Sequence, residues 1–288
     1  MLRSRTTISN GFKRAIKPKL KTITSFTPQV RSMHPSHRIL KGALNKVKAR
    51  VIVRLGSTTT TQEAYPTKTA EQLAKVIQIN TVEAIKNSSS KLLMKRCFTR
   101  AGVKTAQWAE GTDNDAINRL TFPIIAKSHY GSRGEGNTKL DTLAAFETWS
   151  RGKTLSNYIF EKFYTYSKEY RLHVTNDGCF YTCRKLLRND TPESEQWHRH
   201  DENSVWIVEE NPAFKKPSNW NDIVEDCINA KNALGLDICA FDVKTQGSSK
   251  TNPEWIILES CSAPSFGEIT AIKYKEELNR LILQKING

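Results

Sequence analysis

The sequence predicts an α+β fold, on three observations. Segment 157–188 has the pattern of three β-strands, the last two joined by Asn176-Asp177-Gly178, which is a favoured hairpin turn. Segments 236–243 and 255–258 are apolar runs of strand length, joined by the polar turn segment 246–253. Segments 90–102 and 219–235 have the pattern of capped helices that end at glycine.

Composition limits the class of protein. The 288 residues are 38% apolar and include 6 Trp and 11 Phe, enough to bury a sizeable core in one large or two smaller domains. No run approaches 18 uninterrupted apolar residues, so we expect no transmembrane helix and no membrane partner. The six cysteines form no CxxC pair, which favours buried thiols in a reducing compartment over zinc or disulfides.

The positive charge is concentrated at the N-terminus. Residues 1–50 contain 13 Lys and Arg and no acid; subtracting them from 44 and 29 leaves 31 basic and 29 acidic residues, a net charge of +2. This arm lacks the apolar region of a secretory signal, and three interpretations stay open: a solvated tail, an arm that binds nucleic acid or another polyanion, and an organelle transit peptide. We expect a cytoplasmic protein, with organelle import as the alternative. A short basic helix is expected from Ser36, with its apolar side formed by Ile39, Leu40, Ala43, Leu44 and Val47.

The first part of the chain predicts a small βα unit. Segment 51–57 has the pattern of a buried strand and segment 67–79 that of a helix. The next helix begins after Ser89 or Ser90 and ends at Gly102. Lys91 lies in its first turn, where the helix dipole disfavours a cation, so either an anion lies opposite or Lys91 is simply exposed.

A glycine-rich loop follows the next strand. Segment 122–140 predicts a strand ending at Lys127, a loop and a second strand near Thr138. This context does not support a P-loop or a Rossmann turn, both of which connect a strand to a helix. Backbone N–H groups and cations of the loop nevertheless suit phosphate, with a flexible hairpin tip as the alternative. The residues concerned are Gly131, Ser132, Arg133, Gly134 and Gly136.

The central hairpin carries charged residues on one face. Glu169, Arg171 and His173 alternate along one strand, and Cys183 and Lys185 lie across from them. Such a face usually contacts solvent. Asp141 is expected to cap a short helix that extends through Trp149. Segment 189–221 is expected to be mostly loop, with a short strand at 205–208. We favour solvent over substrate as the surroundings of five residues here: Arg188, Trp197, His198, Arg199 and His200.

Two carboxylates lie within the apolar strands near the C-terminus. Asp242 and Glu259 are costly to desolvate there and so require a cation or hydrogen-bond donors. Together with the Ser-Cys-Ser-Ala-Pro turn at 260–264 they form an oxygen-rich cluster suited to Mg²⁺. The alternative is a solvated strand end and an edge-strand carboxylate.

Taken together, segment 52–274 resembles the ATP-grasp superfamily, particularly its ribosomal-protein-modifying glutamate ligase-like branch and phage-encoded relatives. The matching elements are Lys91 before Ala101-Gly102-Val103, Lys127 at a strand end before the small-residue loop, the strand with Glu161, Glu169 followed by Arg171, and the two carboxylates Asp242 and Glu259. The resemblance implies an ATP-grasp fold, with a basic arm at 1–50, a small α/β pre-ATP-grasp unit at 51–109, a lid subdomain at 110–162 and a C-terminal metal-binding subdomain at 163–288.

The resemblance also implies the roles of individual residues. Lys91 and Lys127 would contact the nucleotide phosphates, and the Gly131–Gly136 loop would close over them as a lid. Backbone groups around Glu161, Lys162 and Phe163 would bind adenine, and Glu169 the ribose. Arg171, with Arg184 or Lys185, would stabilise the transferred phosphoryl group. Asp242 and Glu259 would hold one or two Mg²⁺; Cys261 stands where the family has a ligand Asn, and a thiol is a poor ligand for this cation.

The implied function is an ATP- and Mg²⁺-dependent carboxylate–amine ligase that forms an acyl phosphate, with a peptide or protein among the candidate substrates. If the chain is phage-encoded, the host cytoplasm would be its location. Two alternatives stay open: a degenerate nucleotide-binding pseudoenzyme or interaction protein whose arm binds a polyanion, and a kinase-like phosphotransferase. The sequence does not identify the acyl donor or the amine acceptor, and it leaves a homo-oligomer open.

Overall fold

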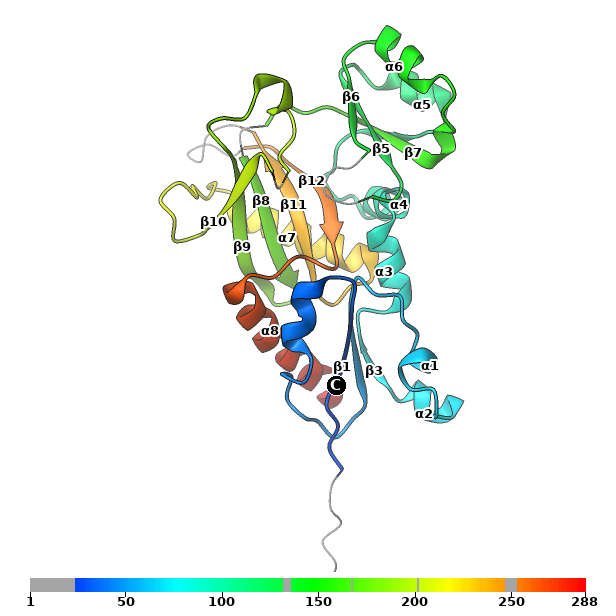
Figure 1. Cartoon of the computed structure of the whole chain (residues 1–288), viewed down its shortest axis with the longest axis vertical. Helices are drawn as coiled ribbons and strands as arrows, with labels where there is room; N and C mark the ends of the chain where they lie inside the picture. The colour runs from blue at the N-terminus through cyan, green and yellow to red at the C-terminus, as the bar shows by residue number, and fades with distance from the viewer. Residues whose placement is uncertain (1–23, 132–135, 167, 201, 247–252) are drawn as a thin grey trace, which may run out of the picture.

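The computed structural model describes residues 24–131, 136–166, 168–200, 202–246 and 253–288. The predicted α+β class is confirmed: three separate sheets follow one another along the long axis of the molecule (Figure 1). The first is formed early in the chain, the second caps the opposite end, and the third lies between them. Within the described residues, no helix is long and apolar enough to cross a membrane.

The first unit is built on a parallel sheet of order β1-β2-β3, formed by Gln29–Ser32, Val51–Leu55 and Ile77–Ile79. The long helix α8 (Glu268–Asn287), the last element of the chain, packs its buried Tyr274 and Leu278 against this sheet. The short helices α1 (Thr61–Ala64) and α2 (Ala70–Ala74) follow β2 and precede β3 in the sequence, and they lie beside the sheet (Figure 1).

Three expectations for this unit are corrected. Residues 24–50 are not a separate arm, because β1 pairs with β2, while residues 1–23 lie outside the described part of the chain. The helix expected from Ser36 is only the 3-10 helix η1 (Pro35–Leu40); Leu40 is buried, but Ile39 is exposed. The helix expected at 67–79 ends at Ala74, and the β-branched residues that follow form β3.

The lid unit at the far end has a four-stranded sheet of order β4-β7-β5-β6. Its strands are Trp108–Glu110 (β4), Tyr158–Lys162 (β7), Ile124–Ser128 (β5) and Thr138–Leu140 (β6). Helices α5 (Asn114–Arg119) and α6 (Leu143–Ser150) cover a small core around Phe160, and the 3-10 helix η2 (Leu155–Asn157) precedes β7. The helix that Asp141 was expected to cap is instead capped by the next residue, Thr142.

The middle unit is an antiparallel sheet of order β10-β9-β8-β11-β12. Its strands are Ser204–Val208 (β10), Gly178–Leu187 (β9), Lys168–Thr175 (β8), Cys239–Thr245 (β11) and Trp255–Cys261 (β12). Both the Asn176-Asp177-Gly178 hairpin and the strand pair around Asp242 and Glu259 are therefore confirmed; residues 247–252 of the predicted connecting turn lie outside the described residues.

Three helices cover one face of the middle sheet (Figure 1). They are α3 (Val82–Ser89), α4 (Lys91–Ala101) and α7 (Trp220–Leu234), and together with the sheet they bury Phe98, Phe241 and Ile223. Ser90 caps α4 as predicted, and Gly102 and Gly235 end α4 and α7 in the left-handed conformation. Because the helices shield one face, polar side chains of the same strands project from the other.

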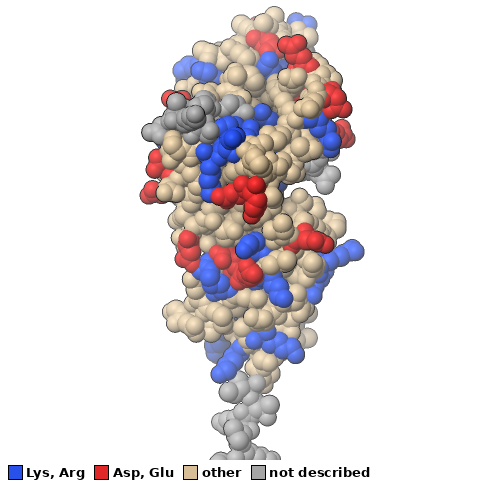
Figure 2. Space-filling model, turned by 90° about the vertical axis from the view of Figure 1, so that its left-hand side faces the viewer, with Lys and Arg blue, Asp and Glu red and all other residues tan. Residues whose placement is uncertain are grey.

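Surface charge is mixed on the face drawn in Figure 2, where Lys and Arg side chains are interspersed with Asp and Glu. This agrees with the small net charge of residues 51–288. All six cysteines are free thiols.

Candidate functional site

A cavity of about 740 Å³ lies over the open face of the middle sheet. Strand β5 of the lid unit and the turn after β1 of the first unit complete its walls. Eight residues predicted from the sequence line it together: Lys127, Gly131, Glu169, Arg171, Lys185, Asp242, Glu259 and Cys261. They represent the predicted phosphate-binding, ribose-binding and metal-binding residues, whereas none of the residues predicted to bind adenine is among them.

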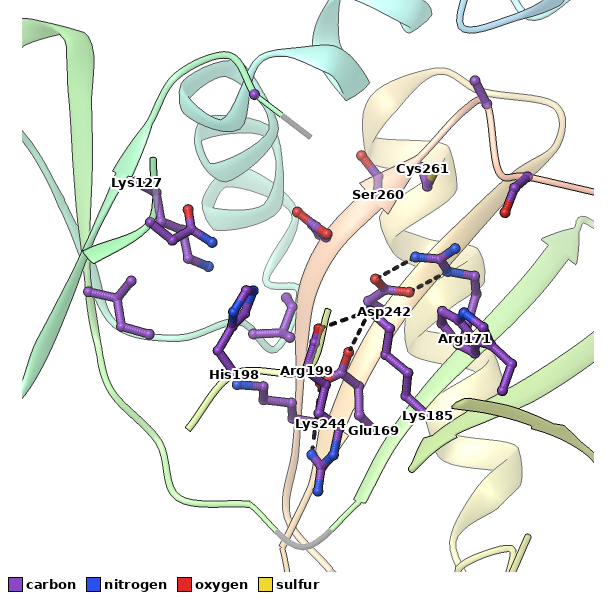
Figure 3. Close-up of a pocket in the computed structure, with 18 of the residues that line it drawn as sticks. Lys127, Glu169, Arg171, Lys185, His198, Arg199, Asp242, Lys244, Ser260 and Cys261 are labelled. Atoms are coloured by element: carbon purple, nitrogen blue, oxygen red, sulfur yellow. Dashed lines mark hydrogen bonds and ion pairs between the residues drawn. The ribbon is translucent and has the colours of Figure 1, made fainter. Parts of the chain in front are cut away.

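Strand register explains why these side chains meet. Directly opposed residues on neighbouring strands form one row across the sheet, consisting of Glu259, Asp242, Arg171 and Cys183. Two residues further along each strand, a second row consists of Lys244, Glu169, Lys185 and Trp206. Because side chains alternate between the two faces of a sheet, both rows project toward the same side, where the cavity lies (Figure 3).

The first row is held by a bidentate ion pair. Arg171 donates from Nε to Asp242 Oδ1 at 2.6 Å and from Nη2 to Oδ2 at 2.8 Å (Figure 3). Burial would raise the pKa of Asp242, but the guanidinium outweighs it and lowers that pKa. Asp242 is therefore an ionised, oriented carboxylate. The side chain of the neighbouring Glu259 forms no hydrogen bond or ion pair with any of the described residues.

The second row surrounds Glu169 with donors and cations. Tyr166 donates its hydroxyl to Glu169 at 3.0 Å, and Lys185 Nζ and Arg199 Nη1 lie 3.8 and 3.9 Å from its carboxylate oxygens. Lys244 lies on the other side, with Nζ 3.7 Å from the centre of the Tyr166 ring. Burial lowers the pKa of Lys244 to about 8, although Glu169 opposes this shift. This end of the cavity is rich in positive charge.

On the lid side, Lys127 belongs to a buried ion triad. Its Nζ lies 2.7 Å from Glu161, whose other oxygen lies 3.0 Å from the fully buried Lys95 of α4. Burial raises the pKa of Glu161, but the two lysines outweigh it and bring that pKa to about 2. Lys95 also donates to Thr105, and Thr105 donates to the Ile257 carbonyl of β12. The triad thus fixes the lid sheet to the middle unit and orients Lys127.

Several predicted site residues do not line the cavity. Lys91 donates to the Gly131 carbonyl at 2.9 Å, and the N–H groups of Lys162 and Phe163 donate to Gln107 and Pro123. The predicted role of Arg184 at the phosphoryl group is wrong. Side chains alternate along β9, so Arg184 lies on the face opposite to Cys183 and Lys185, where it donates to the carbonyls of Ala213 and Phe214. Gly136 and Glu161 lie outside the lining, and Ser132, Arg133 and Gly134 lie outside the described residues.

The sequence reasoning missed part of the lining. Trp197, His198 and Arg199 were expected to face solvent, yet they line the cavity, with His198 and Arg199 drawn close to Lys244 and Glu169 (Figure 3). Burial lowers the pKa of His198 to about 4, so the imidazole is neutral near pH 7. Lys244 could have been found, because it alternates with Asp242 on one strand.

The residues present fit a magnesium ion that is bound mainly through a nucleotide. Mg²⁺ commonly takes one or two carboxylates and completes its ligands with phosphate and water, and Asp242 and Glu259 are opposed across two strands. Cys261 also lines the cavity, but its thiol does not fit. Within the described residues no group of three Asp, Glu, His or Cys side chains could hold a metal without such added ligands.

Comparisons with known proteins identify the fold. No protein-family model matches the chain, and no curated protein sequence does. D-alanine–D-alanine ligase from Bacillus anthracis matches with a TM-score of 0.59 at 13% identity, over 91% of this chain and 99% of that one. N5-carboxyaminoimidazole synthetase from Staphylococcus aureus, complexed with ADP, matches with a TM-score of 0.54 at 17% identity, over 74% of this chain and 54% of that one. The ATP-grasp ligase PsnB, complexed with minimal precursor, gives a TM-score of 0.50 at 15% identity, over 77% and 73%.

These similarities show that the chain has the ATP-grasp fold, as the sequence resemblance implied. The ribosomal-protein-modifying branch and the link to phage-encoded proteins stay predictions.

Proposed function

We propose that this protein is an ATP- and Mg²⁺-dependent ligase that joins a carboxylate to an amine through an acyl phosphate. The supporting observation is that two opposed carboxylates, Asp242 and Glu259, share one cavity with Lys127 of the lid unit and Arg171 between. The resemblance of segment 52–274 extends the proposal to carboxylates and amines on peptides or proteins. The fold shared with ligases of known structure supports it further.

Each group in the cavity would have a separate task. Mg²⁺ bound with the nucleotide would neutralise phosphate oxygens and polarise the transferred group. Glu259 and Asp242 would hold that ion, and the buried triad would aim Lys127 at the phosphates from the lid side. Glu169, already positioned by Tyr166, would accept hydrogen bonds from the ribose hydroxyls. Phosphoryl transfer relies on such positioning and charge neutralisation more than on covalent catalysis.

Arg171 would act on the carboxylate substrate. A carboxylate is a poor electrophile, so one of its oxygens attacks the terminal phosphate of ATP, ADP leaves, and the acyl phosphate that results is then attacked by the amine with release of phosphate. Arg171 is locked by Asp242 through Nε and one Nη2 proton, which leaves Nη1 directed away from that pair. A cation fixed in this way can hold the attacking carboxylate and the negative charge that develops.

The test is release of ADP and phosphate that depends on both a carboxylate and an amine. We expect Lys127→Ala and Glu259→Ala to abolish this release. Lys75→Ala and Glu71→Ala serve as matched controls, because these residues form an exposed ion pair on α2, remote from the cavity. Phosphate recovered on the product instead of in solution would identify a phosphotransferase, and MgATP binding without turnover would identify a degenerate enzyme.

A further inference from the structure

Two large apolar side chains are exposed in the lining of the cavity. Trp206 of β10 is 38% exposed and Met33, after β1, is 73% exposed, and both line the cavity. Large apolar groups left open inside a concave site are typical of ligand contacts. Resting on the proposed function, we infer that the acyl donor is a carboxylate that carries an aromatic or apolar group and no free ammonium group beside it.

Trp206 lies beside the guanidinium group that we assign to the reacting carboxylate. Its ring centre is 4.6 Å from the Arg171 guanidinium carbon and 4.9 Å from Lys185 Nζ. Trp206 is the register partner of Lys185, and Arg171 lies in the neighbouring row of side chains. The indole ring therefore contacts a residue of each row. A carboxylate held by Arg171 therefore brings its neighbouring atoms against this indole.

Met33 of the first unit and Ala263, which follows β12, form an apolar part of the cavity lining. Strand β11 runs from Cys239 toward Thr245, so the Arg171 row lies closer to the first unit than the Glu169 row does. Met33 and Ala263 lie together there: a Cβ added to Gly56 would come within 2.6 Å of Ala263 Cβ and 3.5 Å of Met33 Cβ. An apolar group of the acyl donor that extends from Trp206 toward Met33 and Ala263 would contact apolar side chains.

Among the described residues that line the cavity, no carboxylate is left unengaged to pair with an ammonium group. The described residues that line the cavity include three carboxylates, Glu169, Asp242 and Glu259. Asp242 is held on both oxygens by Arg171, and Glu169 is surrounded by Tyr166, Lys185 and Arg199. In addition, both Asp242 and Glu259 are assigned to the metal ion in the proposed function. A free α-ammonium beside the reacting carboxylate would thus be desolvated next to Arg171 without an anion to compensate it.

The experiment compares three probes that differ in one group each: N-acetyl-L-phenylalanine, L-phenylalanine and N-acetylglycine. Their affinities are measured by calorimetry on the full chain saturated with magnesium and the ATP analogue AMP-PNP. We expect N-acetyl-L-phenylalanine to bind roughly tenfold or more tightly than either of the others, because one probe leaves an ammonium unpaired and the other leaves Trp206 uncovered.

Two variants test the assignment to Trp206. Trp206→Ala should remove the preference for N-acetyl-L-phenylalanine over N-acetylglycine, and Trp206→Phe should retain part of it. Val205→Ala is the matched control, since Val205 is 37% exposed on the same edge strand but lies outside the lining. An unchanged preference in Trp206→Ala, equal binding of L-phenylalanine, or no binding of any probe would overturn the inference.

Failure of the proposed function has a different signature. A chain that does not bind MgAMP-PNP contradicts the ligase proposal, and the three probes are then compared without nucleotide. A Trp206-dependent preference measured there would still support an apolar carboxylate site, and its absence would overturn that as well.

Discussion

Glu161 is a single carboxylate shared by two buried lysines, Lys95 and Lys127. Glu161→Gln would leave both cations without a compensating charge, and we expect it to lower the free energy of unfolding by about 3–5 kcal/mol. Glu110→Gln in the same sheet is the matched control. Its ion pair with Arg96 is partly exposed, so its loss should change stability by less than about 1 kcal/mol. Chemical denaturation measures both, and equal shifts would contradict the assigned role of the triad.

Lys244 gives the cavity a pH-dependent charge. Because its pKa is lowered to about 8, the ammonium loses its proton as the pH rises through that value. An anionic nucleotide binds the protonated form of Lys244 better, so the affinity for MgATP should fall above pH 8. The fall should reach about tenfold for each unit by which the bound nucleotide raises the pKa of Lys244. Lys244→Met should bind more weakly near pH 7 and show a flatter profile. Calorimetry between pH 7 and 9.5 checks this, and identical profiles would refute it.

At the scale of elements, Asn80 fastens the first unit to the middle sheet. Its side chain accepts from the N–H groups of Asp237 and Ile238 and donates to the carbonyls of Arg54 and Ile238, in a fully buried position. Asn80→Ala should therefore destabilise the protein by about 2–4 kcal/mol. Asn87→Ala, which removes one hydrogen bond to Leu234, should have a far smaller effect. Equal thermal shifts for the two variants would contradict the role of Asn80.

The elements that sequence reasoning placed best were those with strong local signals. The Asp-Gly hairpin, the Ser90 cap and the two terminal glycines of α4 and α7 each follow from backbone conformation within a few residues. Strand β1 was missed because it is four residues long and is stabilised by pairing with β2, some 20 residues away. Short strands of this kind depend on tertiary contacts that no local pattern contains.

The candidate site was predictable where residues alternate on a strand. Arg171, Asp242 and Glu259 were identified from their spacing and family resemblance, and the sheet register brings them together. Alternation would also have excluded Arg184, which shares a strand with Lys185 but faces the other side. Trp197, His198 and Arg199 could not be placed, because they lie between η3 (Glu193–Glu195) and β10 in a segment without periodicity.

For the whole molecule, buried histidines predict a loss of stability in mild acid. Burial lowers the pKa of His37 to about 4 and that of His173 to about 3. Between pH 6.5 and 4 the unfolded chain therefore binds more protons than the folded one, and the free energy of unfolding falls as the pH falls. Because His173 is fully buried, its contribution to the decrease in the free energy of unfolding is up to about 1.4 kcal/mol per pH unit. Calorimetric melting at pH 7 and pH 5 checks it; equal transition temperatures would contradict it.

The central claim is that Asp242 and Glu259 hold a nucleotide-bound magnesium opposite Lys127. Its most direct test is calorimetric titration of the protein with MgATP, for the wild type and for Glu259→Ala, Cys261→Asn and the remote control Glu71→Ala. We predict binding in the wild type, at least a tenfold loss in Glu259→Ala, unchanged binding in Glu71→Ala, and equal or tighter binding in Cys261→Asn, which restores an oxygen ligand. Wild-type affinity in Glu259→Ala, or no binding by either the wild type or Cys261→Asn, would contradict the claim.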